Sequence, residues 1–88
     1  MENDITMIEV NAGMETTKQM AIKIMRILRE NLSDWYHLYA RGKKNAKAAQ
    51  QLAKTLVRWI VVDTVYAQRI SGESYLMIKF ERAVDFRE

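Results

Sequence analysis

Residues 16 to 39, TTKQMAIKIMRILRENLSDWYHLY, decide the fold that the sequence predicts. Thr16 and Gln19 have the spacing of a capping box, in which a hydroxyl and a side-chain amide bind backbone N–H groups at a helix start. Apolar side chains then recur at intervals of three and four residues, as on one face of a helix. They are Ala21, Ile24, Met25, Leu28, Leu32, Trp35 and Tyr39. This pattern predicts a long amphipathic helix that begins near Thr16.

The segment Asn31-Leu32-Ser33-Asp34 is the weakest part of this predicted helix. Ser33 is able to cap a new helix, because its hydroxyl can accept a backbone hydrogen bond. The sequence is therefore compatible with a bent helix and with a helix that breaks before Trp35.

Glycine marks the boundaries along the rest of the chain, which has three glycines and no proline. Gly42 is typical of a left-handed helix C-cap, and residues 45 to 70 resume a helical pattern. Its apolar side comprises Ala49, Leu52, Ala53, Leu56, Ile60 and Ala67. We expect a second long helix that packs antiparallel on the first and ends near Gly72.

The two terminal segments allow more than one structure. Residues 5 to 10 are β-branched and short, and they predict a strand or an extended arm within residues 1 to 13. Residues 74 to 86 fit a helix, with Leu76, Phe80 and Phe86 on one face, and they fit an alternating strand nearly as well. The helix is favoured because most of these residues are adequate helix formers.

These elements predict one mainly α domain over residues 1–88. Its architecture would be an antiparallel helical hairpin, or a small bundle, of two long helices plus a C-terminal helix. The alternative is a β-α-α-β arrangement in which the N- and C-terminal strands pair with each other.

The composition is that of a folded protein, with 49% apolar and 28% charged residues among 88. A chain of this size buries only about 60% of its unfolded surface, and without cysteine it has no disulfide to add stability. We therefore expect a homo-oligomer, a dimer or larger. The longest apolar run, Trp59 to Val62, is far too short to span a bilayer, and the N-terminus does not resemble a signal peptide. A cytoplasmic location without membrane contact is expected.

The inventory of catalytic groups is poor. His37 is the only histidine, there is no cysteine, and the carboxylates lack any metal-binding spacing. The segment Arg41-Gly42-Lys43-Lys44 lacks the first glycine and the hydroxyl residue of a phosphate-binding loop. The sequence predicts a non-enzymatic binding protein with no cofactor and no metal.

Charge is distributed unevenly along the chain. Residues 35 to 62 contain no acidic residue, and the basic residues there are Arg41, Lys43, Lys44, Lys47, Lys54 and Arg58. The net charge of the chain is +3, so the remaining residues sum to −3. On a helix, Lys44, Lys47, Lys54 and Arg58 would share one face and form a basic ridge about 21 Å long. Such a ridge predicts binding to a run of phosphates.

Aromatic residues directly precede this basic segment. Trp35 and Tyr39 belong to the predicted core, so Tyr36 and His37 are the candidates for exposed stacking on unpaired bases. The favoured function is therefore binding of RNA or single-stranded DNA, mainly through the nucleic-acid backbone. Three alternatives stay open: an accessory factor or inhibitor of the mobile-element type that docks on an acidic surface of a larger protein complex, a self-assembling structural subunit, and a ridge that is only a solvated helix face.

Overall fold

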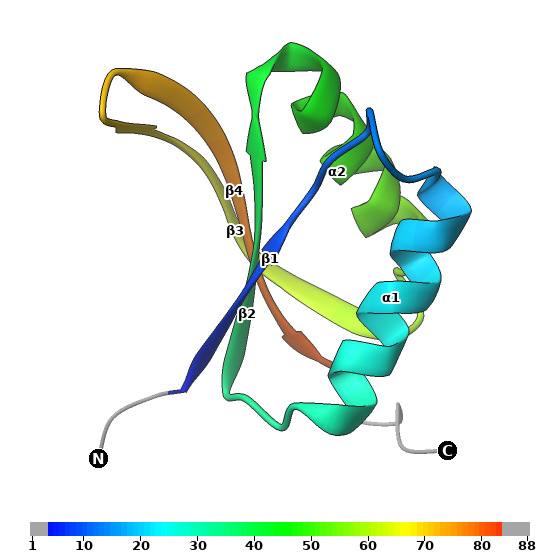
Figure 1. The fold of residues 1–88 in the computed structure, drawn as a ribbon. Helices are drawn as coiled ribbons and strands as arrows, with labels where there is room; N and C mark the ends of the chain where they lie inside the picture. Colours follow the sequence, from blue (N-terminus) through cyan, green and yellow to red (C-terminus); the bar gives the residue numbers. More distant parts are fainter. Residues whose placement is uncertain (1–3, 84–88) are drawn as a thin grey trace.

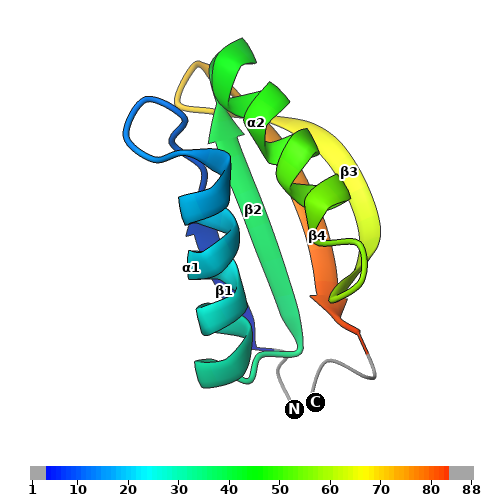
Figure 2. The ribbon, with the colours of Figure 1, turned by 90° about the vertical axis from the view of Figure 1, so that its right-hand side faces the viewer.

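Two helices lie side by side on one face of a four-stranded sheet, and no helix of the described residues covers the opposite face (Figures 1 and 2). The computed structural model describes residues 4–83. The elements in chain order are β1 (Ile5–Glu9), α1 (Thr17–Glu30), β2 (Trp35–Arg41), α2 (Gly42–Thr55), β3 (Ile60–Ile70) and β4 (Glu73–Arg82). The strand order across the sheet is β1-β2-β4-β3.

The prediction of a mainly helical fold is wrong, because the chain forms a mixed α/β structure. The β-α-α-β alternative is also wrong in its pairing. The N-terminal strand β1 runs parallel to β2, and α1 provides the crossover that a parallel pair requires. β4 pairs antiparallel with β2 and β3. β2 therefore lies between the N-terminal strand β1 and the C-terminal strand β4, which do not pair with each other.

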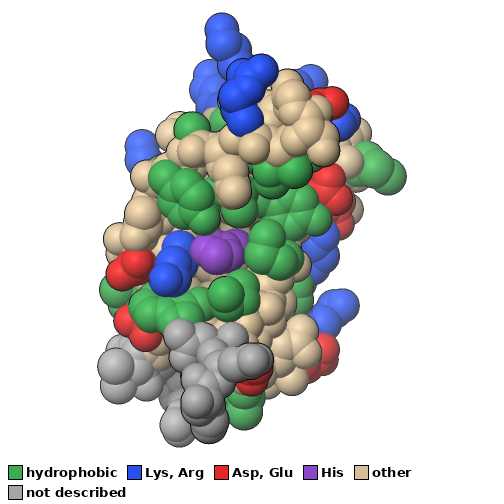
Figure 3. Space-filling view, turned by 90° about the vertical axis from the view of Figure 1, so that its left-hand side faces the viewer, with side chains coloured by type: hydrophobic (Ala, Val, Ile, Leu, Met, Phe, Trp, Pro, Cys, Tyr) green, Lys and Arg blue, Asp and Glu red, His purple; other side chains and the backbone are tan. Residues whose placement is uncertain are grey.

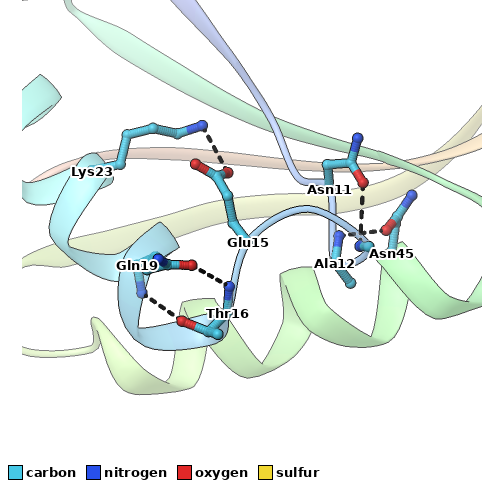
Figure 4. Close-up of polar contacts among 8 residues, drawn as sticks. Asn11, Ala12, Glu15, Thr16, Gln19, Lys23 and Asn45 are labelled. Carbon is cyan, nitrogen blue, oxygen red and sulfur yellow. Dashed lines mark hydrogen bonds and ion pairs between the residues drawn. The ribbon is translucent and has the colours of Figure 1, made fainter.

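The predicted helix start at Thr16 is confirmed. The Thr16 hydroxyl accepts a hydrogen bond from the Gln19 backbone N–H at 3.1 Å, and the Gln19 side chain accepts one from the Thr16 backbone N–H at 2.9 Å (Figure 4). The side chains of Met20, Ile24 and Leu28 on this helix are buried. The predicted apolar face therefore exists as far as Leu28.

The first helix ends at Glu30, so residues 31–34 break the helix and do not bend it. From Trp35 the chain is a strand in which Tyr36, Leu38 and Ala40 are buried while their neighbours are more exposed. Trp35 and Tyr39 are four residues apart. This spacing fits one face of a helix and also one face of a strand, which explains the incorrect assignment.

The second helix is also shorter than predicted. α2 ends at Thr55, and Ile60–Ile70 form the edge strand β3. This part of the chain contains Ile60, Val61, Val62, Thr64 and Val65, and such β-branched side chains favour strands. That local preference outweighs the helical spacing of Ile60 and Ala67.

A tight turn at Ser71 and Gly72 joins β3 to β4. Both residues have positive φ, 52° and 81°, as in the two-residue turns that suit the twist of a hairpin. Gly72 therefore ends a strand and not a helix. In β4, Leu76, Ile78 and Phe80 face the helices, so the strand interpretation of this segment is correct as far as Arg82. Phe86 lies outside the described residues.

The core fills the space between the helices and the covered face of the sheet. Its largest fully buried side chains are Tyr36, Phe80, Met20, Ile24, Leu28, Leu38, Leu52, Leu56, Ile78 and Val10. Asn45 ties the loop after β1 to α2, because its side chain accepts from the Ala12 N–H at 2.8 Å (Figure 4). The same side chain donates to the Arg41 carbonyl at 3.0 Å. Within residues 4–83, neither helix is long and apolar enough to cross a membrane.

Candidate nucleic-acid interface

The basic side chains of α2 lie on its outer surface. Ala49 and Leu52 turn inward and are fully buried. Lys43, Lys44, Lys47 and Lys54 are exposed. The predicted helical spacing is therefore present from Lys44 to Lys54. The amphipathic helix directs these ammonium groups toward solvent.

The ridge is shorter than the sequence predicts. Because α2 ends at Thr55, the distance along the helix from Lys44 to Lys54 is about 15 Å. Arg58 is exposed but lies in the turn that follows the helix. We call Lys44, Lys47, Lys54 and Arg58 the basic ridge, with Arg58 at its end.

The positive charges of the basic ridge are not neutralised by ion pairs among the described residues. In the part of the chain that the structure describes, salt bridges join only Lys23 to Glu15 and Arg41 to Glu73. Arg41, which the sequence places at one end of the basic patch, is thus held 3.3 Å from the carboxylate of Glu73, directly after the turn of the hairpin. The four cations of the ridge have no carboxylate within 4.0 Å among residues 4–83.

The expectation that Tyr36 is exposed for stacking is wrong. Tyr36 is fully buried, and its ring stacks on Phe80 with 5.4 Å between the ring centroids. Its hydroxyl donates to the Asn31 carbonyl at 2.5 Å and accepts from the Ser33 N–H at 3.2 Å. Tyr36 therefore anchors the loop between α1 and β2 and cannot contact a base at the surface.

His37 lies on the other side of β2 and faces away from the helices. Its ring meets Tyr66 edge-on at 6.5 Å, and Lys79 is its direct neighbour on β4. Burial lowers the pKa of His37 below its usual 6.5, and the positive charge of Lys79 lowers it further. Its Nε2 atom is buried and has no hydrogen-bond partner among the described residues.

Trp35 and Tyr39, which the sequence assigns to the core, lie on this same uncovered face of the sheet. Side chains alternate along a strand, so both point to the side opposite Tyr36. Residues opposite each other on paired strands share a face, which adds Lys79, Met77, Tyr75 and Tyr66. We define the aromatic face as Trp35, His37, Tyr39, Tyr66, Tyr75, Met77 and Lys79. Figure 3 shows the single histidine at its centre, surrounded by hydrophobic side chains.

The alternation in residues 35 to 39 is the signal that could have revealed this face. Trp35, His37 and Tyr39 occupy every second position, which is the period of a strand. The helical interpretation correctly predicts that Trp35 and Tyr39 share a face, but it assigns that face to the core and not to the side of the sheet away from the helices.

A hollow of about 370 Å³ lies between the start of α2 and the hairpin. Its walls include Ala40, Ala46, Ala67 and Leu76, with Lys43 and Tyr75 among the remaining residues. Across residues 4–83, no three His, Cys, Asp or Glu side chains are grouped so that they could hold a metal ion. Because most of the surface that lines it is apolar, the hollow offers mainly apolar contacts to a ligand.

Comparisons with known proteins show what this fold resembles. No protein-family model matches the chain, and no curated protein matches it. Among solved structures, the crystal structure of ALBA1 from Trypanosoma brucei is similar, with a TM-score of 0.76 and 16% sequence identity. The match covers 92% of this chain and 73% of that chain. The likeness shows that the two chains share a fold.

Proposed function

We propose that this chain is a small, non-enzymatic protein that binds nucleic acid through the basic ridge. The observation that carries the proposal is the outer surface of α2, where Lys44, Lys47 and Lys54 are exposed and unpaired in the described structure. Solvated helix faces usually mix both charges, because oppositely charged neighbours stabilise a helix and like charges destabilise it slightly. A ridge that omits every acid is better explained by an anionic partner.

Such a ridge would bind the phosphate backbone and not the bases. Lysine presents a flexible point charge, and each phosphate that it neutralises releases condensed counterions. Because α2 is packed against the sheet through Ala49, Leu52 and Leu56, the basic ridge is presented on a rigid support. Binding is expected to depend strongly on salt and weakly on sequence.

An acidic protein surface is the alternative partner for the ridge. The protein would then be an accessory factor or inhibitor of the mobile-element type. A pull-down that retains one protein after nuclease treatment favours this alternative, whereas recovery of nucleic acid alone contradicts it.

A second observation favours self-association. β3 is an edge strand that pairs only with β4 among residues 4–83, and its residues from Val61 to Ile70 are all exposed. Val61 and Val65 are each 51% exposed, and Val57, in the turn before β3, is 68% exposed. Exposed apolar side chains along an unpaired edge are typical of an interface. We propose that a second copy of the chain covers this edge.

Fluorescence anisotropy of labelled single-stranded RNA, single-stranded DNA and duplex DNA, titrated at several salt concentrations, tests the proposed function. Three to five phosphate contacts predict that the logarithm of the binding constant falls with log salt at a slope of about −2 to −3.5 for single strands and about −3 to −4.5 for duplex DNA. Absence of binding at low salt would contradict the proposal and leave the acidic protein partner.

A further inference from the structure

The aromatic face is a second surface that the basic ridge does not explain. It carries the rings of Trp35, Tyr39, Tyr66 and Tyr75 and the imidazole of His37 on one side of the sheet. The helices lie on the other side (Figure 2), and the lysines of the basic ridge are exposed on α2. None of the five rings is fully buried, so each presents some surface to a ligand.

The rings are grouped at two positions along the strands. Tyr39 and Tyr75 lie 6.2 Å apart with their planes tilted by 48°, near the hairpin end of β2. Trp35 is four residues away on the same strand, a distance of about 13 Å. The face therefore offers two separate stacking positions, with His37 and Lys79 between them.

The charge at the centre of this face favours an anionic occupant. Lys79 has no carboxylate within 4.0 Å in the described part of the chain, and its ammonium lies 4.2 Å from the centroid of the Trp35 ring. The face has acidic side chains too: Glu9 on its outer strand β1, Glu81 beyond Lys79 on β4, and Glu73, which forms an ion pair with Arg41. An unpaired cation among aromatic rings matches a planar base attached to a phosphate.

We propose that the aromatic face binds unpaired bases of single-stranded nucleic acid. The proposal rests on the proposed function and adds a base-binding surface to the backbone-binding ridge. A base would stack on Tyr39 and Tyr75, and another on Trp35 in the place that the Lys79 ammonium now occupies. Lys79, released from the ring, would then contact the adjoining phosphate.

The polar groups at the centre of this face argue against a second copy of the chain there. Exposed aliphatic side chains flank the aromatic face on both outer strands, at Ile5 and Met7 on β1 and at Val61 on β3. Others, at Val62 and Val65, lie on the side of β3 that faces the helices. Between these apolar side chains, the aromatic face carries a cation, Lys79, and an imidazole, His37, at its centre. A nucleic-acid strand uses both kinds of group, whereas an apolar dimer interface would have to desolvate them.

Tryptophan fluorescence tests the proposal directly, because the chain has two tryptophans in different places. Trp59 packs against the core, so its replacement in the Trp59→Phe variant leaves Trp35 as the only reporter. We expect short oligothymidylate to quench Trp35 emission and to saturate at the concentration at which anisotropy shows binding. Duplex DNA and inorganic polyphosphate should bind the ridge without this quenching.

Two outcomes overturn the proposal in different ways. Binding of oligothymidylate by anisotropy with unchanged Trp35 emission would remove the base-binding face and leave the ridge intact. Absence of binding by either signal would remove the proposed function as well.

The Tyr39→Ala variant provides an independent measurement. Loss of one stacking ring should weaken single-strand binding roughly tenfold and change duplex binding less than about twofold. Ile22→Ala, which shortens an exposed apolar side chain on α1, is the matched control and should change neither affinity. Unchanged single-strand affinity in a folded Tyr39→Ala protein that no longer self-associates would assign the face to a second copy and overturn the proposal.

Discussion

Lys79 lies directly opposite His37 on the neighbouring strand, at the centre of the uncovered face of the sheet. Burial first, and the positive charge of Lys79 second, hold the pKa of His37 below its ordinary value of 6.5. Near pH 6.5, the imidazole is therefore mostly neutral in the folded protein, whereas in the unfolded chain it already binds a proton part of the time. This difference links the stability of the fold to pH.

The stability of the protein should decrease as the pH falls below about 6.5. Between 6.5 and the lower pKa of the folded state, the unfolded chain binds more protons than the native chain, so protonation favours unfolding. Well above 6.5 both states are neutral at His37, and this contribution to the pH dependence vanishes. Urea unfolding at pH 7.5 and 5.5 measures the effect, and His37→Gln should reduce the difference between the two free energies of unfolding.

Nuclear magnetic resonance gives a direct check, because His37 is the only histidine and its ring signals need no assignment among several. Lys79→Met should move the pKa of His37 back toward 6.5 without reaching it, since burial remains. A pKa of His37 at or above 6.5 in the unmodified protein would contradict this description of its environment.

Tyr36→Phe should destabilise the fold by about 1 to 2 kcal/mol, because the variant loses the hydrogen bonds to Asn31 and Ser33 inside a buried site. The ring stacked on Phe80 is retained, so nucleic-acid affinity should not change. Denaturant unfolding and anisotropy on the same samples measure the two effects. Weakened binding in a fully folded Tyr36→Phe protein would mean that Tyr36 reaches the surface after all.

Val65→Lys should separate the subunits of an oligomer, because it introduces a charge into the apolar edge that we propose a second copy covers. Val65 is exposed in the single chain, so the variant should keep its fold. Light scattering measures the mass, and circular dichroism measures the secondary structure. Leu32→Lys, at an exposed apolar residue outside β3, is the control. An oligomer of unchanged mass in the Val65→Lys variant would place the interface elsewhere.

Local signals in the sequence were reliable where one interaction determines the structure. The Thr16 and Gln19 capping box is such a case, since it needs only two side chains and a helix start. The helix α2 is a second such case, because its lysines and its buried residues Ala49 and Leu52 recur at intervals of three and four residues, as on the two faces of a helix. The exposure of these lysines was therefore predictable, whereas what binds to them remains a proposal.

Predictions failed where pairing between distant strands decides the structure. Residues 35 to 39 fit both a helix and a strand, and the choice depends on β1 and β4, which flank β2 in the sheet. The register of those pairs also decides that Trp35 and Tyr39 face outward and Tyr36 inward. The alternation of Trp35, His37 and Tyr39 indicates that these residues share a strand face, but the sequence of one strand does not show whether that face is covered by the helices.

The most direct test of the central claim is a charge reversal on the basic ridge. In the Lys47→Glu, Lys54→Glu, Arg58→Glu triple variant, three exposed cations become anions while the core contacts of α2 stay intact. The matched control reverses Lys18, Arg26 and Arg29, which are exposed on α1 and have the same total charge. We predict that the ridge variant loses detectable binding to labelled single-stranded DNA at low salt, while the control keeps most of its affinity and both proteins remain folded by circular dichroism. Equal affinity of the folded ridge variant and the unmodified protein would contradict the account, and so would an equal loss in both variants, because net charge alone would then explain binding.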